Sequence, residues 1–305
     1  MTTFRAGFAC FVGRPNAGKS TLTNALVGTK VAITSNRPQT TRHAVRGILH
    51  RPDAQLILVD TPGLHRPRTL LGQRLNDVVR ATWTEVDVVG LCLPANEAVG
   101  PGDRYIATEL AAATKGGRGT PVLALVTKTD LVGPDKVAAA LLAAQKLGAD
   151  TGLELAEIVP VSAQAAFQLE LLTELLVARL PAGQPLYLDG ELTDEPEETL
   201  IAELIREAAL EGVRDELPHS LAVSIDEMGP GDSEGVLLIH ATVHVERDSQ
   251  KPIVLGTGGV RLKAVGSAAR RQIEALLGTK VYLDLHVNVL KDWQRDPRQL
   301  RRLGF

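Results

Sequence analysis

The chain has 305 residues, of which 44% are hydrophobic and 23% charged, and its 33 basic and 36 acidic residues leave a formal charge of −3. This length favours two domains, and the composition is typical of a globular protein rather than a disordered or disulfide-rich one. The near-neutral charge argues against a general attraction to nucleic acid or anionic membrane, so any such surface must be local.

Two cysteines, Cys10 and Cys92, each lie in an apolar, strand-like run. They are expected to be small core residues in a reducing compartment rather than a disulfide pair. No stretch approaches 18 uninterrupted apolar residues, and residues 1–5 lead almost directly into the first apolar run without a signal-peptide segment. The sequence therefore predicts a cytoplasmic protein.

A glycine-rich stretch near the start matches the pattern G-x-x-x-x-G-K-[ST]. It lies between an apolar run at 8–12 and a helical pattern at 21–26, which is the context of a phosphate-binding loop. Lys19 is expected to reach the β- and γ-phosphates of a nucleoside triphosphate, and Ser20 to hold Mg²⁺. The alternative is a turn that merely separates strand and helix. The nucleotide-binding residues predicted here are Gly13, Arg14, Pro15, Asn16, Ala17, Gly18, Lys19, Ser20 and Thr21.

A polar segment at 31–42 shows neither helical nor strand periodicity and is expected to be a long loop. Two short strands at 44–50 and 55–60 follow as a hairpin, and the second ends in Asp60. This carboxylate fits the group that steadies Mg²⁺, and the backbone N–H of Gly63 fits a contact with the γ-phosphate. A plain Pro-Gly turn is the alternative. The predicted nucleotide-binding residues of this segment are Asp60, Thr61, Pro62, Gly63 and Leu64.

Helical and strand-like patterns then alternate, which predicts a doubly wound α/β domain. The expected helices span 70–83, 103–114 and 135–147, and the expected strands span 86–93, 121–126 and 157–161.

The last two of these strands end in residues suited to reading a base. Asp130 has the acceptor oxygens to pair with N1–H and the exocyclic amine of guanine, a pairing that adenine does not offer. A backbone N–H at Ser162 or Ala163 is expected to meet the guanine oxygen. The first of these sites comprises Thr127, Lys128, Thr129 and Asp130.

The sequence changes character after residue 183. Residues 184–197 are acidic and interrupted by proline, which is typical of a linker, so the predicted domains are 1–183 and 198–305. The second domain is expected to contain helix 198–213, strands 220–226 and 235–246, a short helical turn near Pro252, helix 260–277 and strand 281–290. This αββααβ order with a G-x-x-G loop resembles a type II KH domain, which implies binding of single-stranded RNA.

Basic residues surround this loop: five lie between positions 251 and 271, without an acidic residue. A solvated basic face explains the same pattern. The predicted RNA-binding residues are Lys251, Gly256, Thr257, Gly258, Gly259, Arg261, Lys263 and Arg270. The basic tail that begins at Lys291 is expected to supplement them, through Arg295, Arg298, Arg301 and Arg302.

The ordered motifs at 13–20, 37–42, 60–63, 127–130 and 161–163 resemble the translation-factor-related GTPases, and more closely the Era family of ribosome-assembly GTPases. The resemblance extends to 218–223 and to the closing residues, so it covers essentially the whole chain. It implies a monomeric GTPase that acts on the small ribosomal subunit near the end of its RNA, in the cytoplasm, with peripheral membrane contact allowed. Thr41 would be the switch threonine that senses Mg²⁺ and the γ-phosphate, ahead of Thr40, and Asn16 would help to hold K⁺.

Two segments depart from the family pattern, at Thr127 and at Thr257 and Gly258, and Leu64 differs from Ras-like enzymes as is usual in the family. Thr127 replaces an asparagine that ties the base-binding loop to the phosphate loop, so weaker nucleotide binding is expected. Leu64 stands where Ras-like enzymes place a water-orienting glutamine, so intrinsic hydrolysis should be slow. Thr257 and Gly258 replace the usual basic residue of the glycine loop. A metabolite kinase and an RNA-binding module with a degenerate nucleotide site are the alternative functions.

Overall fold

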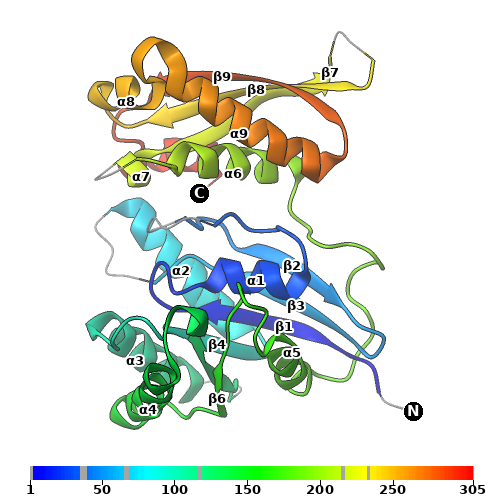
Figure 1. The fold of residues 1–305 in the computed structure, drawn as a ribbon, viewed down its shortest axis with the longest axis vertical. Coiled ribbons are helices and arrows are strands. Elements are labelled where there is room, and N and C mark those ends of the chain that lie inside the picture. The colour runs from blue at the N-terminus through cyan, green and yellow to red at the C-terminus, as the bar shows by residue number, and fades with distance from the viewer. Residues whose placement is uncertain are drawn as a thin grey trace. The chain divides into compact units, whose positions relative to one another are not determined.

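The computed structural model describes residues 3–34, 40–64, 69–115, 119–213, 217–231 and 234–304. The main division between its two compact units falls between Asp194 and Glu195 (Figure 1). Each unit has its own sheet and its own buried core, so the two are described separately.

The first unit contains a six-stranded mixed sheet with the order β2-β3-β1-β4-β5-β6. β2 pairs antiparallel with β3, whereas β3, β1, β4, β5 and β6 pair in parallel, so their carboxyl ends meet at one edge. The strands are β1 (Arg5–Val12), β2 (Val45–His50), β3 (Ala54–Asp60), β4 (Val88–Pro94), β5 (Val122–Thr127) and β6 (Glu157–Pro160). The predicted doubly wound mixed sheet is confirmed.

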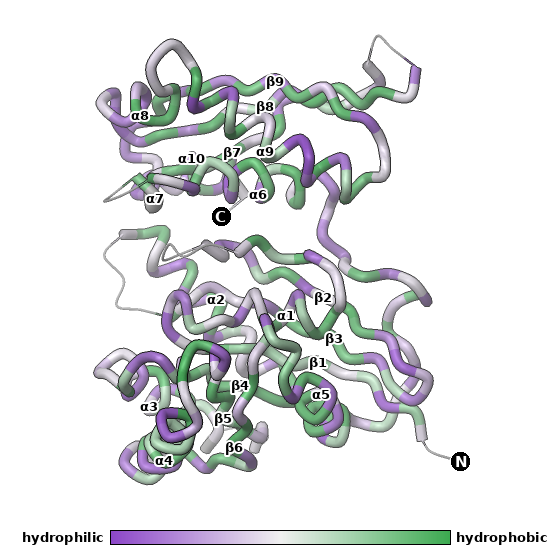
Figure 2. Tube along the Cα trace, in the orientation of Figure 1, coloured by the Kyte–Doolittle hydropathy of each residue, from purple (hydrophilic) through white to green (hydrophobic). Residues whose placement is uncertain are grey.

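Helices cover both faces of this sheet (Figure 1). Alternate residues of β1 enter different cores: Phe11 packs with α1 and α5, and Val12 packs in the core that receives α2, α3 and α4. The central strands are accordingly hydrophobic along much of their length (Figure 2). The helices are α1 (Lys19–Val27), α2 (Leu70–Glu85), α3 (Pro101–Lys115), α4 (Pro134–Thr151) and α5 (Leu169–Val177). Helix α5 was not among the elements predicted from the sequence.

The segment before the division differs from the flexible linker that its composition suggests. The Ile48 N–H donates to the Leu192 carbonyl at 2.9 Å, and the Arg46 guanidinium pairs with Asp194 at 2.8 Å. The Gln55 side chain accepts from the Tyr187 N–H at 3.0 Å and donates to the Tyr187 carbonyl at 3.0 Å. Residues 186–194 therefore lie along strands β2 and β3 of the first unit, and the predicted linker 184–197 belongs mostly to that unit.

The second unit has a three-stranded sheet with the order β7-β8-β9. β7 and β8 are antiparallel, and β8 and β9 are parallel. The elements are α6 (Glu197–Leu210), α7 (Leu217–Ser220), β7 (Ala222–Pro230), β8 (Val236–Val245), α8 (Lys251–Leu255), α9 (Val260–Leu277), β9 (Lys280–Val289) and α10 (Pro297–Arg302). The predicted αββααβ order is present, with α7 and α10 as two short additions.

Helices α6 and α9 pack on one face of this sheet and bury Ile205, Ile273 and the β8 residue Ala241 completely. Trp293, after β9, is also fully buried, and its Nε1–H donates to the Ser220 carbonyl at 3.1 Å.

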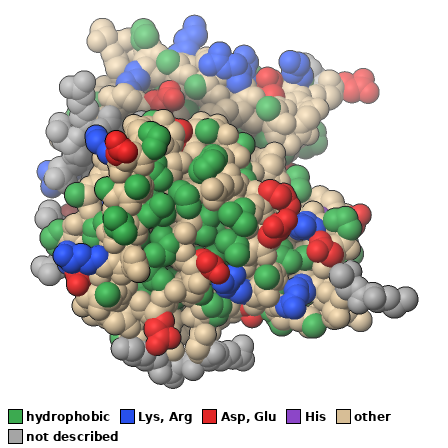
Figure 3. Space-filling model, turned by 60° about the horizontal axis from the view of Figure 1, so that its bottom comes forward, with side chains coloured by type: hydrophobic (Ala, Val, Ile, Leu, Met, Phe, Trp, Pro, Cys, Tyr) green, Lys and Arg blue, Asp and Glu red, His purple; other side chains and the backbone are tan. Residues whose placement is uncertain are grey.

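On the face drawn in Figure 3, acidic and basic side chains are interspersed, as the near-neutral formal charge of −3 leads one to expect. Among the described residues, every helix is too short or too polar to cross a membrane.

Candidate nucleotide and RNA sites

The glycine-rich stretch forms the turn between β1 and α1. Gly18 caps α1 with φ 92°, a left-handed conformation that glycine adopts without a steric penalty. Lys19 is the first residue of the helix, and its side chain is 6% exposed. The Nζ atom donates to the Arg14 carbonyl at 3.1 Å and to the Gly13 carbonyl at 3.4 Å. Burial lowers the pKa of Lys19, so a bound anion would stabilise its charged form.

Three oxygen-bearing side chains meet beside this loop. The Ser20 hydroxyl donates to Asp60 Oδ2 at 2.6 Å, the Thr41 hydroxyl donates to the same oxygen at 3.2 Å, and the two hydroxyl oxygens lie 2.9 Å apart. Asp60 Oδ1 is buried without a hydrogen-bond partner among the described residues, and burial raises the Asp60 pKa. A hard cation with oxygen ligands would satisfy this cluster, which therefore fits Mg²⁺.

The segment after β3 passes very close to the glycine-rich loop. A Cβ atom on Gly63 would lie 2.8 Å from the Pro15 nitrogen, so only glycine fits there without a shift. The Thr61 hydroxyl donates to the Phe11 carbonyl at 3.1 Å and fixes the start of the segment. Leu64 is 2% exposed and packs in the core, so its side chain is not placed to orient water. Residues 65–68 lie outside the described residues. The same is true of residues 35–39, which are part of the predicted 31–42 loop.

The side chain of Arg14 forms ion pairs with two acidic residues. Its Nε donates to Asp103 at 2.8 Å, and its NH2 pairs with Glu97 at 3.0 Å. Asp103 also accepts from the Gly100 N–H at 2.8 Å. Arg14 thus braces the loop against the start of α3, and its predicted contact with nucleotide is left to its backbone. Sequence reasoning missed both acidic partners because they lie more than 80 positions away.

The residues predicted to read the base meet at the ends of β5 and β6. The Thr127 hydroxyl donates to the Ala17 carbonyl at 2.7 Å, so this chain connects the two loops through a threonine hydroxyl where the family pattern has an asparagine amide. The Ser162 hydroxyl donates to Asp130 Oδ1 at 2.5 Å. Ser162 was predicted to act through its backbone, and its side chain in addition contacts the carboxylate of Asp130, which is exposed.

Asn16 lies at the outer side of the phosphate loop. Its backbone is left-handed, with φ 62°, a conformation in which asparagine is enriched, and the residue is exposed. Its side chain is therefore placed at the surface of the loop, beside the buried Ala17.

The second site is the glycine loop between α8 and α9. Gly256, Gly258 and Gly259 have φ values of 71°, 59° and 79°, a backbone region that glycine adopts without a steric penalty. Helix α9 begins at the next residue, Val260, and directs the N–H groups of its first turn toward the loop.

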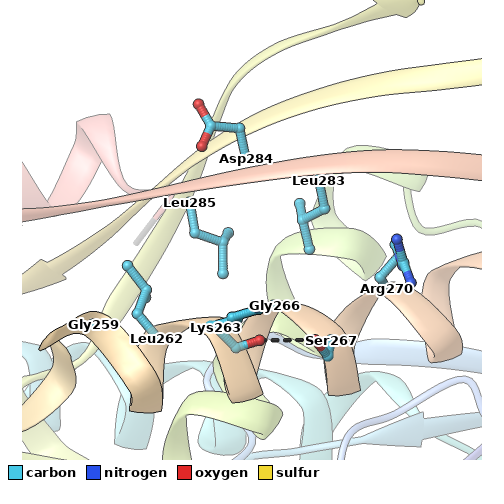
Figure 4. Close-up of a pocket in the computed structure, with 9 residues that line it drawn as sticks. All are labelled: Gly259, Leu262, Lys263, Gly266, Ser267, Arg270, Leu283, Asp284 and Leu285. Carbon is cyan, nitrogen blue, oxygen red and sulfur yellow. Dashed lines mark hydrogen bonds between the residues drawn. The ribbon is translucent and has the colours of Figure 1, made fainter. Parts of the chain in front are cut away.

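A groove of about 490 Å³ continues from the loop between α9 and β9 (Figure 4). Leu262 of α9 and Leu283 and Leu285 of β9 project into it, whereas Asp284 points away from α9. Lys263 and Arg270 line the groove and are exposed. An apolar floor with basic residues at its edge suits a nucleic acid base with its phosphates.

One predicted RNA-binding residue, Arg261, donates to backbone carbonyls of its own domain. The Arg261 guanidinium donates to the Ala209 carbonyl at 2.8 Å, to the Glu211 carbonyl at 3.0 Å and to the Ile253 carbonyl at 3.1 Å. Three of its five N–H donors are thus used by backbone carbonyls of α6 and α8. Lys251 is exposed on α8 next to the loop.

Family models match both units. Residues 8–128 match the model described as 50S ribosome-binding GTPase, and residues 216–294 match the KH domain model. The chain is 68% identical to the GTPase Era of Streptomyces coelicolor, over 100% of this chain and 96% of the relative. It is 66% identical to the GTPase Era of Mycolicibacterium smegmatis, over 100% of both chains.

Solved structures agree with these matches. The chain superposes with a TM-score of 0.92 and 37% identity on Era in complex with MgGDPNP and nucleotides 1506–1542 of 16S ribosomal RNA, over 99% of both chains. The same TM-score, identity and coverage apply to a Tyr-to-Ala variant of Aquifex aeolicus Era bound to GDP·AlF4⁻. Full-length identity well above half, both domain models and the shared fold lead to one conclusion: the chain belongs to the Era family of GTPases.

Proposed function

We propose that this protein is a GTP-dependent switch that binds ribosomal RNA through the glycine loop of its KH domain during assembly of the small ribosomal subunit. The proposal of nucleotide binding rests on one cluster of side chains. The hydroxyls of Ser20 and Thr41 both donate to one carboxylate oxygen of Asp60, beside the buried ammonium of Lys19. The relative with the solved RNA complex supports the second half.

The nucleotide half assigns a task to each group around the phosphate loop. Lys19 balances the charge of the β- and γ-phosphates, and the backbone of residues 13–18 wraps around them. Ser20, Thr41 and Asp60 would hold Mg²⁺, which supplies charge neutralisation between the β- and γ-phosphates when it is bound. Gly63 brings a backbone N–H close to the γ-phosphate, and Asp130, oriented by Ser162, reads guanine.

Hydrolysis in this chain is expected to be slow without help. Leu64 is buried in the core, so no side chain at that position orients the attacking water. We propose that K⁺ at Asn16 offsets part of the charge that develops in the transition state. The match of Asn16 to the asparagine that helps to hold K⁺ in potassium-stimulated relatives supports this assignment.

The RNA half rests on the glycine loop, on Lys251, Lys263 and Arg270, and on the groove between α9 and β9. Backbone N–H groups at the start of α9 would meet the phosphates, and the leucine floor would receive a base. We further propose that the protein acts as a monomer in the cytoplasm, bound to the small subunit. Peripheral membrane contact belongs to the same proposal.

The alternative is an RNA-binding module with a degenerate nucleotide site, and calorimetric titration separates the two. The wild-type chain should bind GTP and GDP in the presence of Mg²⁺, and a Lys19→Ala variant should lose about a hundredfold of GTP affinity, since a buried charge-assisted contact to phosphate is worth about 3 kcal/mol. Absence of GTP binding by the folded wild-type chain would contradict the proposal. RNA binding that persists in that case would favour the alternative.

A further inference from the structure

We propose that Arg261 is the positioning residue of the glycine loop. Its hydrogen bonds hold the two ends of the loop together and attach them to α6, and the side chain makes no RNA contact itself. The inference rests on the proposed RNA function of this loop. It also reverses the simplest interpretation of a basic residue two positions after a G-x-x-G loop, which is a phosphate contact.

The contacts of the guanidinium carry the proposal. Arg261 is the second residue of α9, and the Ile253 carbonyl that accepts from its NH1 at 3.1 Å belongs to α8, three residues before Gly256. One side chain therefore joins the two helices that flank the loop. Its NH2 donates at 2.8 and 3.0 Å to the carbonyls of Ala209 and Glu211 at the end of α6. The loop is thus fixed from both ends to a third helix.

These acceptors are groups that a helix leaves unpaired. The last four carbonyls of a helix lack partners within it, and a cation near them is stabilised by the helix dipole. Helix α6 ends at Leu210, so the Ala209 and Glu211 carbonyls lie at this terminus. Burial lowers the pKa of Arg261, yet a guanidinium stays charged at any accessible pH. The guanidinium therefore remains charged while it donates to the backbone carbonyls of α6 and α8.

Close packing leaves little room for the loop to move away from this side chain. A Cβ atom on Gly256 would lie 2.7 Å from the Arg261 Cβ and 3.0 Å from the Arg261 nitrogen. The first glycine of the loop therefore rests directly on the backbone of Arg261. Movement of the arginine would shift the loop glycines, whose N–H groups are those proposed to meet RNA phosphates.

Lysine cannot replace arginine in this role. A guanidinium offers five donors in a fixed plane and reaches three carbonyls at once, whereas an ammonium is a compact point charge on a flexible stem. Lysine does, however, serve well as a phosphate contact. The substitution Arg261→Lys therefore separates the two roles, because it preserves the charge and removes the geometry.

The experiment measures binding of a single-stranded oligonucleotide from the 3′ region of small-subunit ribosomal RNA to the full chain at several salt concentrations. Arg261→Lys and Arg261→Ala should each lose about tenfold in affinity, equal to about 1.4 kcal/mol, with the wild-type slope of affinity against salt. Lys263→Ala, the matched control for a phosphate contact, should make the slope shallower by about 0.7. Arg271→Ala, an exposed charge on α9 outside the groove, controls for general charge loss.

Hydrogen exchange on the same variants reads the loop directly. Amides 256–262 should exchange faster in both Arg261 variants, while those of β8 keep their wild-type protection, which separates a local effect from unfolding. Wild-type affinity in Arg261→Lys, a shallower salt slope in Arg261→Ala, or unchanged exchange at the loop would overturn the proposal.

Failure of the proposed RNA function has a different signature. If Gly258→Asp binds the oligonucleotide as tightly as the wild type, RNA does not use this loop. Hydrogen exchange of the Arg261 variants still decides whether Arg261 positions the loop, because this measurement needs no RNA.

Discussion

The hydroxyl of Thr127 donates to the carbonyl of Ala17 at 2.7 Å and so joins the base-binding strand end to the phosphate loop. Thr127 is 4% exposed and Ala17 is fully buried, so the hydrogen bond is shielded from water. A threonine thus supplies, with one donor, a connection that the family pattern assigns to asparagine. The two halves of the nucleotide site are held together in this chain despite the altered motif.

Loss of this hydroxyl should weaken nucleotide binding. Thr127→Val keeps the shape of the side chain but leaves the Ala17 carbonyl buried without its partner, which costs about 1 to 3 kcal/mol. We expect about a tenfold loss of affinity for both GTP and GDP, measured with a fluorescent guanine nucleotide. Thr127→Ser, which retains the donor, is the matched control. Equal affinities for the valine and serine variants would show that the tie has no role in binding.

The assignment of Asp130 predicts a change of base preference. In Asp130→Asn one acceptor becomes an amide donor, which suits the C2 carbonyl of xanthine and not the amine of guanine. Competition between GTP and xanthosine triphosphate should therefore shift toward the latter by at least about a hundredfold. Unchanged GTP affinity would remove Asp130 from the base site. Ser162→Ala, which removes only the group that orients Asp130, should weaken GTP binding by about tenfold without a change of preference.

The Ser20, Thr41 and Asp60 cluster predicts a difference between the two nucleotides. Because a bound Mg²⁺ would neutralise phosphate charge that GTP carries and GDP lacks, Ser20→Ala should reduce GTP affinity more than GDP affinity when Mg²⁺ is present. The difference should disappear when Mg²⁺ is chelated. An equal loss for GTP and GDP in Mg²⁺ would indicate a folding defect, which unfolding monitored through Trp83, buried in the same unit, would detect.

Monovalent ions test the proposed role of Asn16. Hydrolysis in K⁺ should exceed hydrolysis in Na⁺ at matched ionic strength, and Asn16→Ala should reduce the rate in K⁺ to about the rate in Na⁺. Identical wild-type rates in the two salts would leave Asn16 as a loop residue whose left-handed φ of 62° favours asparagine.

Much of the fold was predictable because it follows from local patterns. The apolar run before Gly13 and the helical pattern after it gave β1 and α1, and the strand ending at Asp60 was placed correctly. Hydrophobic periodicity also gave the order of elements in the KH domain. The short helices α7 and α10 have too few turns to show a period.

Side-chain partners far apart in sequence were not predictable. The Arg14–Asp103 pair, the Thr127–Ala17 hydrogen bond and the Arg261 contacts join residues separated by 89, 110 and 8 to 52 positions. Composition likewise suggested a flexible linker at 184–197, because hydrogen bonds such as that of Ile48 with Leu192 are made by backbone and leave no signal in residue type. Sequence motifs predicted which residues lie near one another in the candidate site. The structure shows which contacts hold these residues in place.

The KH domain of this GTPase is proposed to hold single-stranded ribosomal RNA at its glycine loop. Crosslinking of the intact protein to ribosomal RNA, with a non-hydrolysable GTP analogue bound, followed by mapping of the crosslinked peptides, tests it most directly. We predict crosslinks to the 3′ region of small-subunit RNA within residues 251–270, and their loss in Gly258→Asp, where a negative charge would face the phosphates. Crosslinks confined to other segments, or unchanged yields in folded Gly258→Asp, would contradict the claim.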